Sequence, residues 1–190
     1  MTYQAEGYGN QGCAAPEYAP EYAQGAEGTR PGRAAGERIA YYGWNSNGIF
    51  LVNATLEWKD GYWKDVVFFE MREGVGRGNQ RTYSRESGIR MLGDATDLRA
   101  LAHAIRGLVA HRQSTFKKFT DPSRAKATTG GGRQKMLTLG CQEGRFYINM
   151  SQERKISVSY DAFTMLSMAD QIERIASRLE DALYSKQHSA

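Results

Sequence analysis

The chain has very little cysteine. Of its 190 residues only Cys13 and Cys141 carry a thiol, and they lie far apart in the sequence. No apolar run approaches the roughly 18 residues that a membrane-spanning helix needs, and no apolar stretch of the kind found in secretory signal peptides precedes the cysteines. We therefore expect a reduced, intracellular protein, in the cytoplasm, nucleoid or nucleus, with no membrane partner.

The patterns that accompany catalysis and metal binding are also missing. His103 and His111 fall eight residues apart in a predicted helix, and His188 lies near the end of the chain. No spacing of cysteine and histidine fits a zinc site, and no nucleophile stands in a recognisable arrangement with a base. The glycine-rich stretches are not followed by the Gly-Lys-Ser/Thr of a nucleotide-binding P-loop. We expect no enzymatic activity, no metal and no cofactor.

Positive charge is absent from the first 28 residues, which contain four acids and no lysine or arginine. Residues 1 to 38 consist mainly of Gly, Ala, Tyr, Gln, Glu and Pro, and such a segment cannot bury enough apolar surface to offset the entropy of ordering it. We predict a disordered tail over residues 1–38. The whole chain carries a formal charge of +4, so the remainder is more basic than the average, which permits a polyanionic partner without requiring one.

An internal repeat is the most informative feature that is present. Eight residues between positions 89 and 105 match the residues that lie 67 positions later, between 156 and 172. Five of the eight pairs are identical, and three exchange one apolar residue for another. The matched pairs are Ile89/Ile156, Met91/Val158, Asp94/Asp161, Ala95/Ala162, Leu98/Met165, Leu101/Met168, Ala102/Ala169 and Ile105/Ile172. This periodicity predicts one supersecondary unit used twice.

Each unit is predicted to be several antiparallel strands followed by one helix. In the first unit, residues 39–113, strands are expected at 48–58 and 62–72 around an Asp60-Gly61 turn, then at 81–83 and 88–92. A helix should follow to about residue 112, capped by Asp94 or Asp97. The second unit, residues 114–190, begins with a basic linker over 117–135. Strands at 134–141, 145–152 and 155–160 and a helix at 161–184 should follow. The predicted fold class is α+β.

Alternating strand residues suggest what an uncovered sheet face could bind. In the strand at 62–72, Trp63 and Phe69 share one side and Lys64 and Arg72 share the other, and the pattern does not tell which side is open. Arg145 and Tyr147 share a side in the second unit. Interleaved rings and cations suit single-stranded nucleic acid, because bases stack on rings and phosphates meet cations. Ordinary strand packing is the alternative explanation for any single aromatic residue.

Two glycine-rich loops, around residues 74–78 and 130–132, could bring backbone amides and cations close to phosphates. Arg77, Arg81, Arg133 and Lys135 flank them. The complete set of candidate nucleic-acid-binding residues is Trp63, Lys64, Phe69, Arg72, Arg77, Arg81, Lys117, Lys118, Arg124, Lys126, Arg133, Lys135, Arg145 and Tyr147.

Several segments resemble known families. The stretch 153–163, preceded by 144–149, resembles the end of a PUR repeat. The stretch 62–73, followed by 87–91 and a helix, is similar to the single-stranded-DNA-binding transcriptional coactivator family, and Whirly proteins share this strand-strand-strand-strand-helix unit in doubled form. The resemblance implies two β-β-β-β-α repeats packed into one PUR/Whirly-like domain that binds single-stranded DNA or RNA on its sheets, often as a dimer. The tail and the basic segment between the units depart from that pattern.

The function we expect is therefore largely sequence-tolerant binding of single-stranded DNA or RNA by base stacking and phosphate contacts, by a homodimer or higher homo-oligomer. The alternative is a structural or assembly protein that forms homo-oligomers through its repeats and tail.

Overall fold

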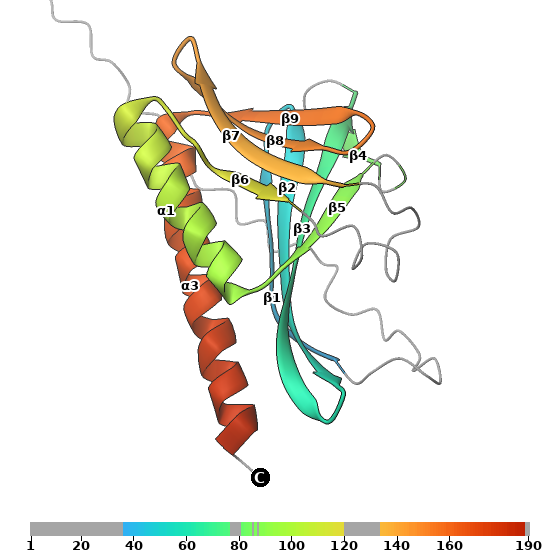
Figure 1. Cartoon of the computed structure of the whole chain (residues 1–190). Coiled ribbons are helices and arrows are strands. Elements are labelled where there is room, and N and C mark those ends of the chain that lie inside the picture. The colour runs from blue at the N-terminus through green and yellow to red at the C-terminus, as the bar shows by residue number, and fades with distance from the viewer. Residues whose placement is uncertain (1–35, 77–80, 85, 87, 120–133, 189–190) are drawn as a thin grey trace, which may run out of the picture. The chain divides into compact units, whose positions relative to one another are not determined.

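The structure is a computed structural model that describes residues 36–76, 81–84, 86, 88–119 and 134–188 (Figure 1). The predicted disordered tail therefore lies outside the described residues, except for residues 36–38. These three residues begin a strand, so order starts slightly before the expected position at Ile39. No helix within the described ranges is long and apolar enough to cross a membrane.

The first sheet is antiparallel and is built around one long hairpin. Strands β1 (Gly36–Asn45), β2 (Gly48–Lys59) and β3 (Tyr62–Val75) lie side by side, and both β4 (Thr82–Tyr83) and β5 (Ile89–Gly93) pair with β3. Asp60 and Gly61 connect β2 to β3 with φ values of 57° and 87°. These left-handed conformations suit a tight turn between twisted antiparallel strands, and the predicted hairpin is confirmed. Strand β1 was not predicted.

The second sheet has four antiparallel strands in sequence order. They are β6 (Lys117–Phe119), β7 (Met136–Gln142), β8 (Arg145–Ser151) and β9 (Lys155–Tyr160). The turn between β7 and β8 places Glu143 and Gly144 at φ values of 50° and 76°, which suit a tight turn between antiparallel strands. Strand β6 was expected to be part of a basic linker, and the structure corrects this: it is the edge strand that gives the second half its fourth strand.

Each sheet leads into one helix with an aspartate cap. In α1 (Ala95–His111), the Asp94 carboxylate accepts the backbone N–H of Asp97 at 2.9 Å, and Asp97 accepts the N–H of Asp94 at 3.1 Å. Both predicted caps therefore act together as a capping box. In α3 (Ala162–His188), Asp161 accepts the N–H of Thr164 at 2.7 Å, which lowers the pKa of Asp161.

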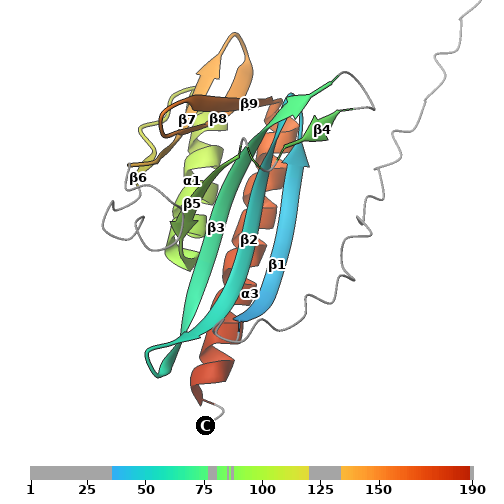
Figure 2. The same cartoon turned by 90° about the vertical axis from the view of Figure 1, so that its right-hand side faces the viewer.

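The two helices form the layer that covers the sheets. Helix α3 packs across β1, β2 and β3, while α1 packs antiparallel to α3 and contacts β7 (Figures 1 and 2). The helical positions matched by the 67-residue shift are fully buried from Leu98 to Ile105 in α1 and from Met165 to Ile172 in α3. The predicted α+β architecture of two β-β-β-β-α repeats is confirmed.

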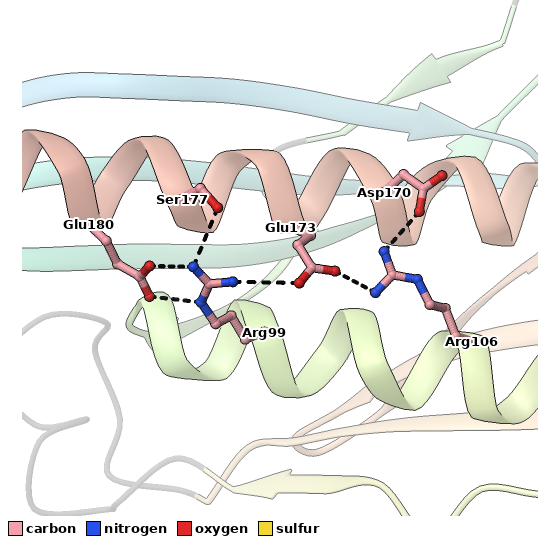
Figure 3. A network of polar contacts seen from close by, with 6 residues as sticks. All are labelled: Arg99, Arg106, Asp170, Glu173, Ser177 and Glu180. Atoms are coloured by element: carbon pink, nitrogen blue, oxygen red, sulfur yellow. Dashed lines mark hydrogen bonds and ion pairs between the residues drawn. The ribbon is translucent and has the colours of Figure 1, made fainter.

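A ladder of ion pairs joins the exposed sides of α1 and α3 (Figure 3). Arg106 donates to Asp170 at 2.8 Å and to Glu173, and Arg99 donates to Glu180 at 2.9 Å and to Glu173 at 3.5 Å. Arg106 and Glu173 are themselves 67 positions apart, so these repeat-equivalent residues face each other. Antiparallel helices that meet at equivalent positions are what a pseudo-twofold axis between the repeats requires.

The first sheet meets the second at the β1–β2 turn. The Asn47 amide nitrogen donates to the carbonyl of Ser157 at 3.1 Å, and its oxygen accepts the N–H of Ser159 at 2.9 Å, so one side chain occupies the edge of β9. The buried Tyr160 hydroxyl donates to the carbonyl of Trp44 at 2.7 Å. A Cβ at Gly48 would lie 2.8 Å from a side-chain carbon of Val158, so β2 passes close to β9 only because this position is glycine.

Candidate nucleic-acid interface

Each sheet has an inner face toward the helices and an open face. On the first sheet the inner residues are fully buried, among them Phe50, Val52, Val67 and Met71, and Figure 2 shows α3 behind this sheet. The open side of β3 is therefore the set that contains Lys64, Val66, Phe68, Glu70 and Arg72. This answers the question that strand alternation left unresolved.

Two predicted stacking residues lie on the inner face. Phe69 is 0% exposed and stacks with Phe50 at 6.3 Å between ring centroids, so the prediction that it binds a base is wrong because its ring is part of the core. Trp63 is partly buried at the end of the hairpin, with its ring 5.6 Å from that of Trp58 and under the ammonium of Lys186 at 5.2 Å. Trp63 does not lie on an open face.

The open face of the second sheet brings three predicted residues together, Lys117 from β6 and Arg145 and Tyr147 from β8. The registers place them on one side with Lys155 and with Phe119, whose side chain is 48% exposed. The strand residues of this face are Lys117, Phe119, Met136, Thr138, Gly140, Gln142, Arg145, Tyr147, Asn149, Ser151, Lys155, Ser157 and Ser159. Along strands β6 to β9, this face includes no Asp or Glu.

Hydroxyl and amide groups fill the space between the cations of that face. The Ser157 hydroxyl donates to Asn149 at 2.6 Å, and the Arg145 guanidinium lies 3.5 Å from the Ser159 hydroxyl. The face thus offers positive charge, rings and neutral hydrogen-bonding groups. It can attract phosphates, stack bases and meet sugar hydroxyls without repelling a polyanion.

The open face of the first sheet carries compensated charge. Lys64 and Arg72 lie on it, as predicted for binding residues, but Arg72 pairs with Glu70 at 2.5 Å and Lys64 pairs with Asp60 at 3.3 Å. The Lys64 ammonium also lies 4.2 Å from the ring of Tyr62. Hydrogen bonding to Tyr62 and Asp60 raises the pKa of Lys64. Lys64 therefore keeps its positive charge, which the nearby Asp60 carboxylate partly offsets.

The remaining candidate cations within the described residues, Lys118, Arg81 and Lys135, contact other parts of the protein. Lys118 points inward and pairs with Asp97 at 2.5 Å, and Arg81 donates to the carbonyl of Ser46. Lys135 is 4% exposed and donates to the carbonyl of Arg90 at 2.7 Å, and burial lowers its pKa. The hypothesis of a phosphate site at the two glycine-rich loops is corrected for Arg81 and Lys135, because a guanidinium nitrogen of Arg81 and the ammonium of Lys135 donate to backbone carbonyls of the protein.

The other loop candidates, Arg77, Arg124, Lys126 and Arg133, lie outside the described residues. Within the described part of the chain, no group of three or more His, Cys, Asp or Glu residues could hold a metal ion.

Sequence reasoning did not single out Phe119, Asn149, Lys155 or Ser157. The alternation from Arg145 through Tyr147 could have been extended by two residues to Asn149. Phe119 gave no such signal, because β6 has only three residues and lies in a basic segment.

No known protein family matches the sequence, and no curated protein matches it. Among solved structures, the chain is similar to the plant transcriptional regulator PBF-2, with a TM-score of 0.51 and 14% sequence identity. The match covers 80% of this chain and 90% of the other. At this identity the likeness shows the fold alone, and the predicted Whirly-like fold is confirmed.

Proposed function

We propose that this protein binds single-stranded nucleic acid, DNA or RNA, on the open face of the second sheet, largely without regard to sequence. One observation supports this above all: along its strands the face combines Lys117, Arg145 and Lys155 with the rings of Tyr147 and Phe119 and carries no carboxylate. Cations near a groove or sheet contact the phosphate backbone of any sequence, and every base has a π-face that can stack on a ring. The similarity to a transcriptional regulator is consistent with such a role.

The test compares single-stranded DNA, single-stranded RNA and duplex DNA by fluorescence anisotropy over a salt series. Replacing Lys117, Arg145 and Lys155 together by alanine should weaken binding to all single strands. The slope of log affinity against log salt should flatten by about 0.7 for each phosphate that the variant no longer neutralises. Tyr147→Leu should cost about 1–3 kcal/mol of binding free energy with little change in slope.

Arg174→Ala and Arg178→Ala provide a matched control, because these exposed cations lie on α3, away from the second sheet. They should leave affinity and slope unchanged. If the wild type binds no single strand at low salt, the proposed function is wrong. If the triple variant keeps both the affinity and the slope of the wild type, the open face of the second sheet is not the binding site.

A second candidate function, self-assembly, is favoured by an exposed apolar pair at the start of α3. Phe163 is 83% exposed and Leu166, three residues later on the same helical side, is 41% exposed. A second copy of the chain could cover them. Sedimentation over a concentration series should then show an oligomer that Phe163→Ser and Leu166→Ser dissociate. A protein that stays monomeric at all concentrations would exclude this function.

A further inference from the structure

The centre of the open face of the first sheet holds a buried polar atom without a partner. Tyr41 on β1, Asn53 on β2 and Phe68 on β3 stand directly opposite one another and form a row across three strands, here called the Asn53 row. The side-chain oxygen Oδ1 of Asn53 is buried and accepts no hydrogen bond from any described residue.

Such an orphan acceptor is unusual and costly, because a buried polar group that loses water without gaining a partner destabilises the folded state. The nearest hydroxyl on the same face of β2, that of Thr55, donates to the carbonyl of Val66 at 3.3 Å. Comparable amides are satisfied: the oxygen of Asn149 accepts the Ser157 hydroxyl, and that of Asn47 accepts a backbone N–H. An apolar side chain at position 53 would avoid the cost, so the amide requires an explanation other than stability.

The neighbours of Asn53 are planar groups of the kind on which bases stack. The Tyr41 side chain is 46% exposed, and the Arg38 guanidinium lies 5.6 Å from its ring centroid. On the other side, the Arg90 guanidinium covers the Phe68 ring at 3.5 Å. Rings and guanidinium planes are the surfaces on which proteins stack unpaired bases, and here they flank an amide with free acceptor capacity.

We propose that Asn53 is a specificity-determining residue that reads an adenine of the bound single strand. The side-chain oxygen would accept a hydrogen bond from the adenine N6 amino group, an edge contact of the kind that asparagine makes to adenine. Rotation about the soft terminal torsion of the side chain would turn Oδ1 toward the open face, in the row with Tyr41 and Phe68. This inference rests on the proposed binding of single strands. It places an additional contact on the open face of the first sheet, apart from the proposed face of the second sheet, and adds a preference for adenine to binding that is otherwise sequence-tolerant.

The first experiment measures the affinities of wild type and Asn53→Leu for oligo-dA, oligo-dT and an oligomer with purine, which lacks the 6-amino group, in place of adenine. The wild type should lose about fivefold or more in affinity when adenine is replaced by purine, and Asn53→Leu should lose nothing, because the missing bond is worth about as much as other base contacts. Stacking of adenines within the free strand lowers the affinity of both proteins equally. The ratio of the two affinities for one oligomer is therefore independent of it.

Equal wild-type affinities for the adenine and purine oligomers would overturn the proposal, and this comparison needs no variant. Equal losses in wild type and Asn53→Leu would overturn it as well. Wild-type binding without base preference refutes only this inference, whereas no binding to any single strand refutes the proposed function itself.

The second experiment separates recognition from a structural role by urea unfolding. Asn53→Leu removes an orphan acceptor and should leave the unfolding midpoint unchanged or raise it. Asn149→Leu, the matched control on the other sheet, removes an amide that is hydrogen-bonded and should lower the midpoint. If Asn53→Leu lowers the midpoint as Asn149→Leu does, Asn53 is a structural residue and the proposal is wrong.

Discussion

Replacing Ile105 by alanine tests both the core and the repeat, because this residue lies fully buried in α1, the helix that packs against α3. The change removes three carbon atoms from a site that is 0% exposed. At about 0.8 kcal/mol for each buried carbon group, the transfer contribution is about 2.4 kcal/mol. The cavity left behind raises the loss toward 5 kcal/mol, and the better helix propensity of alanine returns only a few tenths.

The repeat makes a second, linked prediction. Ile172 is the equivalent of Ile105 at the 67-residue shift and is equally buried in α3, so Ile172→Ala should also cost about 2–5 kcal/mol. Because both residues belong to one core cluster, the double variant should depart from additivity.

Urea unfolding followed by tryptophan fluorescence measures these losses, and an unchanged m-value shows that the two states being compared are still the same. Leu166→Ala is the control: it is also a large-to-small change in α3, but at a side chain that is 41% exposed, and it should change stability by less than about 1 kcal/mol. Losses below about 1 kcal/mol in both isoleucine variants at constant m-value would refute the assigned helix faces and the equivalence of the repeats.

Three further changes probe the caps and the junction. Asn47→Ala removes two hydrogen bonds to β9 and should cost about 1–3 kcal/mol in urea unfolding; a loss below about 0.5 kcal/mol would show that β9 does not depend on them. The pKa of Asp161 lies below its ordinary value of 3.8, chiefly because the Thr164 amide donates to the carboxylate. The ionised Asp161 carboxylate therefore stabilises the folded protein above pH 3.8, and this contribution is lost as the pH falls through the lowered pKa. When the free energy of unfolding is measured against pH, Asp161→Ala should lack this part of the decrease in acid. Tyr160→Phe leaves the buried carbonyl of Trp44 without its donor and should lower stability by about 1–3 kcal/mol, whereas an unchanged unfolding midpoint would contradict this role.

The repeat could be found from sequence because of where its matched segments lie. Strand β5 runs directly into α1, and β9 runs directly into α3, so no insertion disturbs the shift between Ile89 and Ile156 or between Ile105 and Ile172. All matched apolar positions except Ala162 are buried in both segments. Burial on one side of a helix constrains residue type strongly, and the aspartate caps mark each helix start.

The two strands that prediction missed lack that constraint. Among the ten residues of β1 only Trp44 is buried, and Tyr41 and Tyr42 are 46% and 44% exposed, because an edge strand has neighbours on one side only. Strand β6 has three residues and no buried one. Without alternating burial there is no period of two to detect.

The binding residues could be predicted by type but not by location. Strand alternation places Phe68 and Phe69 on opposite faces of the sheet. Which of them faces the core depends on the side where α3 packs, and α3 lies far away in the sequence. The same holds for Lys135, whose ammonium meets the Arg90 carbonyl 45 residues away. The pairing of β6, β7 and β8 brings Lys117, Arg145 and Tyr147 to one face of the sheet. No local sequence pattern contains this pairing.

The ion pair between Arg106 and Glu173 affects which half of the chain each half pairs with. In a dimer of identical repeats, the residue at this place on the twofold axis would face a copy of itself, arginine against arginine or glutamate against glutamate, and like charges would repel. The attraction exists only because the halves carry opposite charges at the same place. This contact therefore favours pairing of the first half with the second half over pairing of either half with another copy of itself.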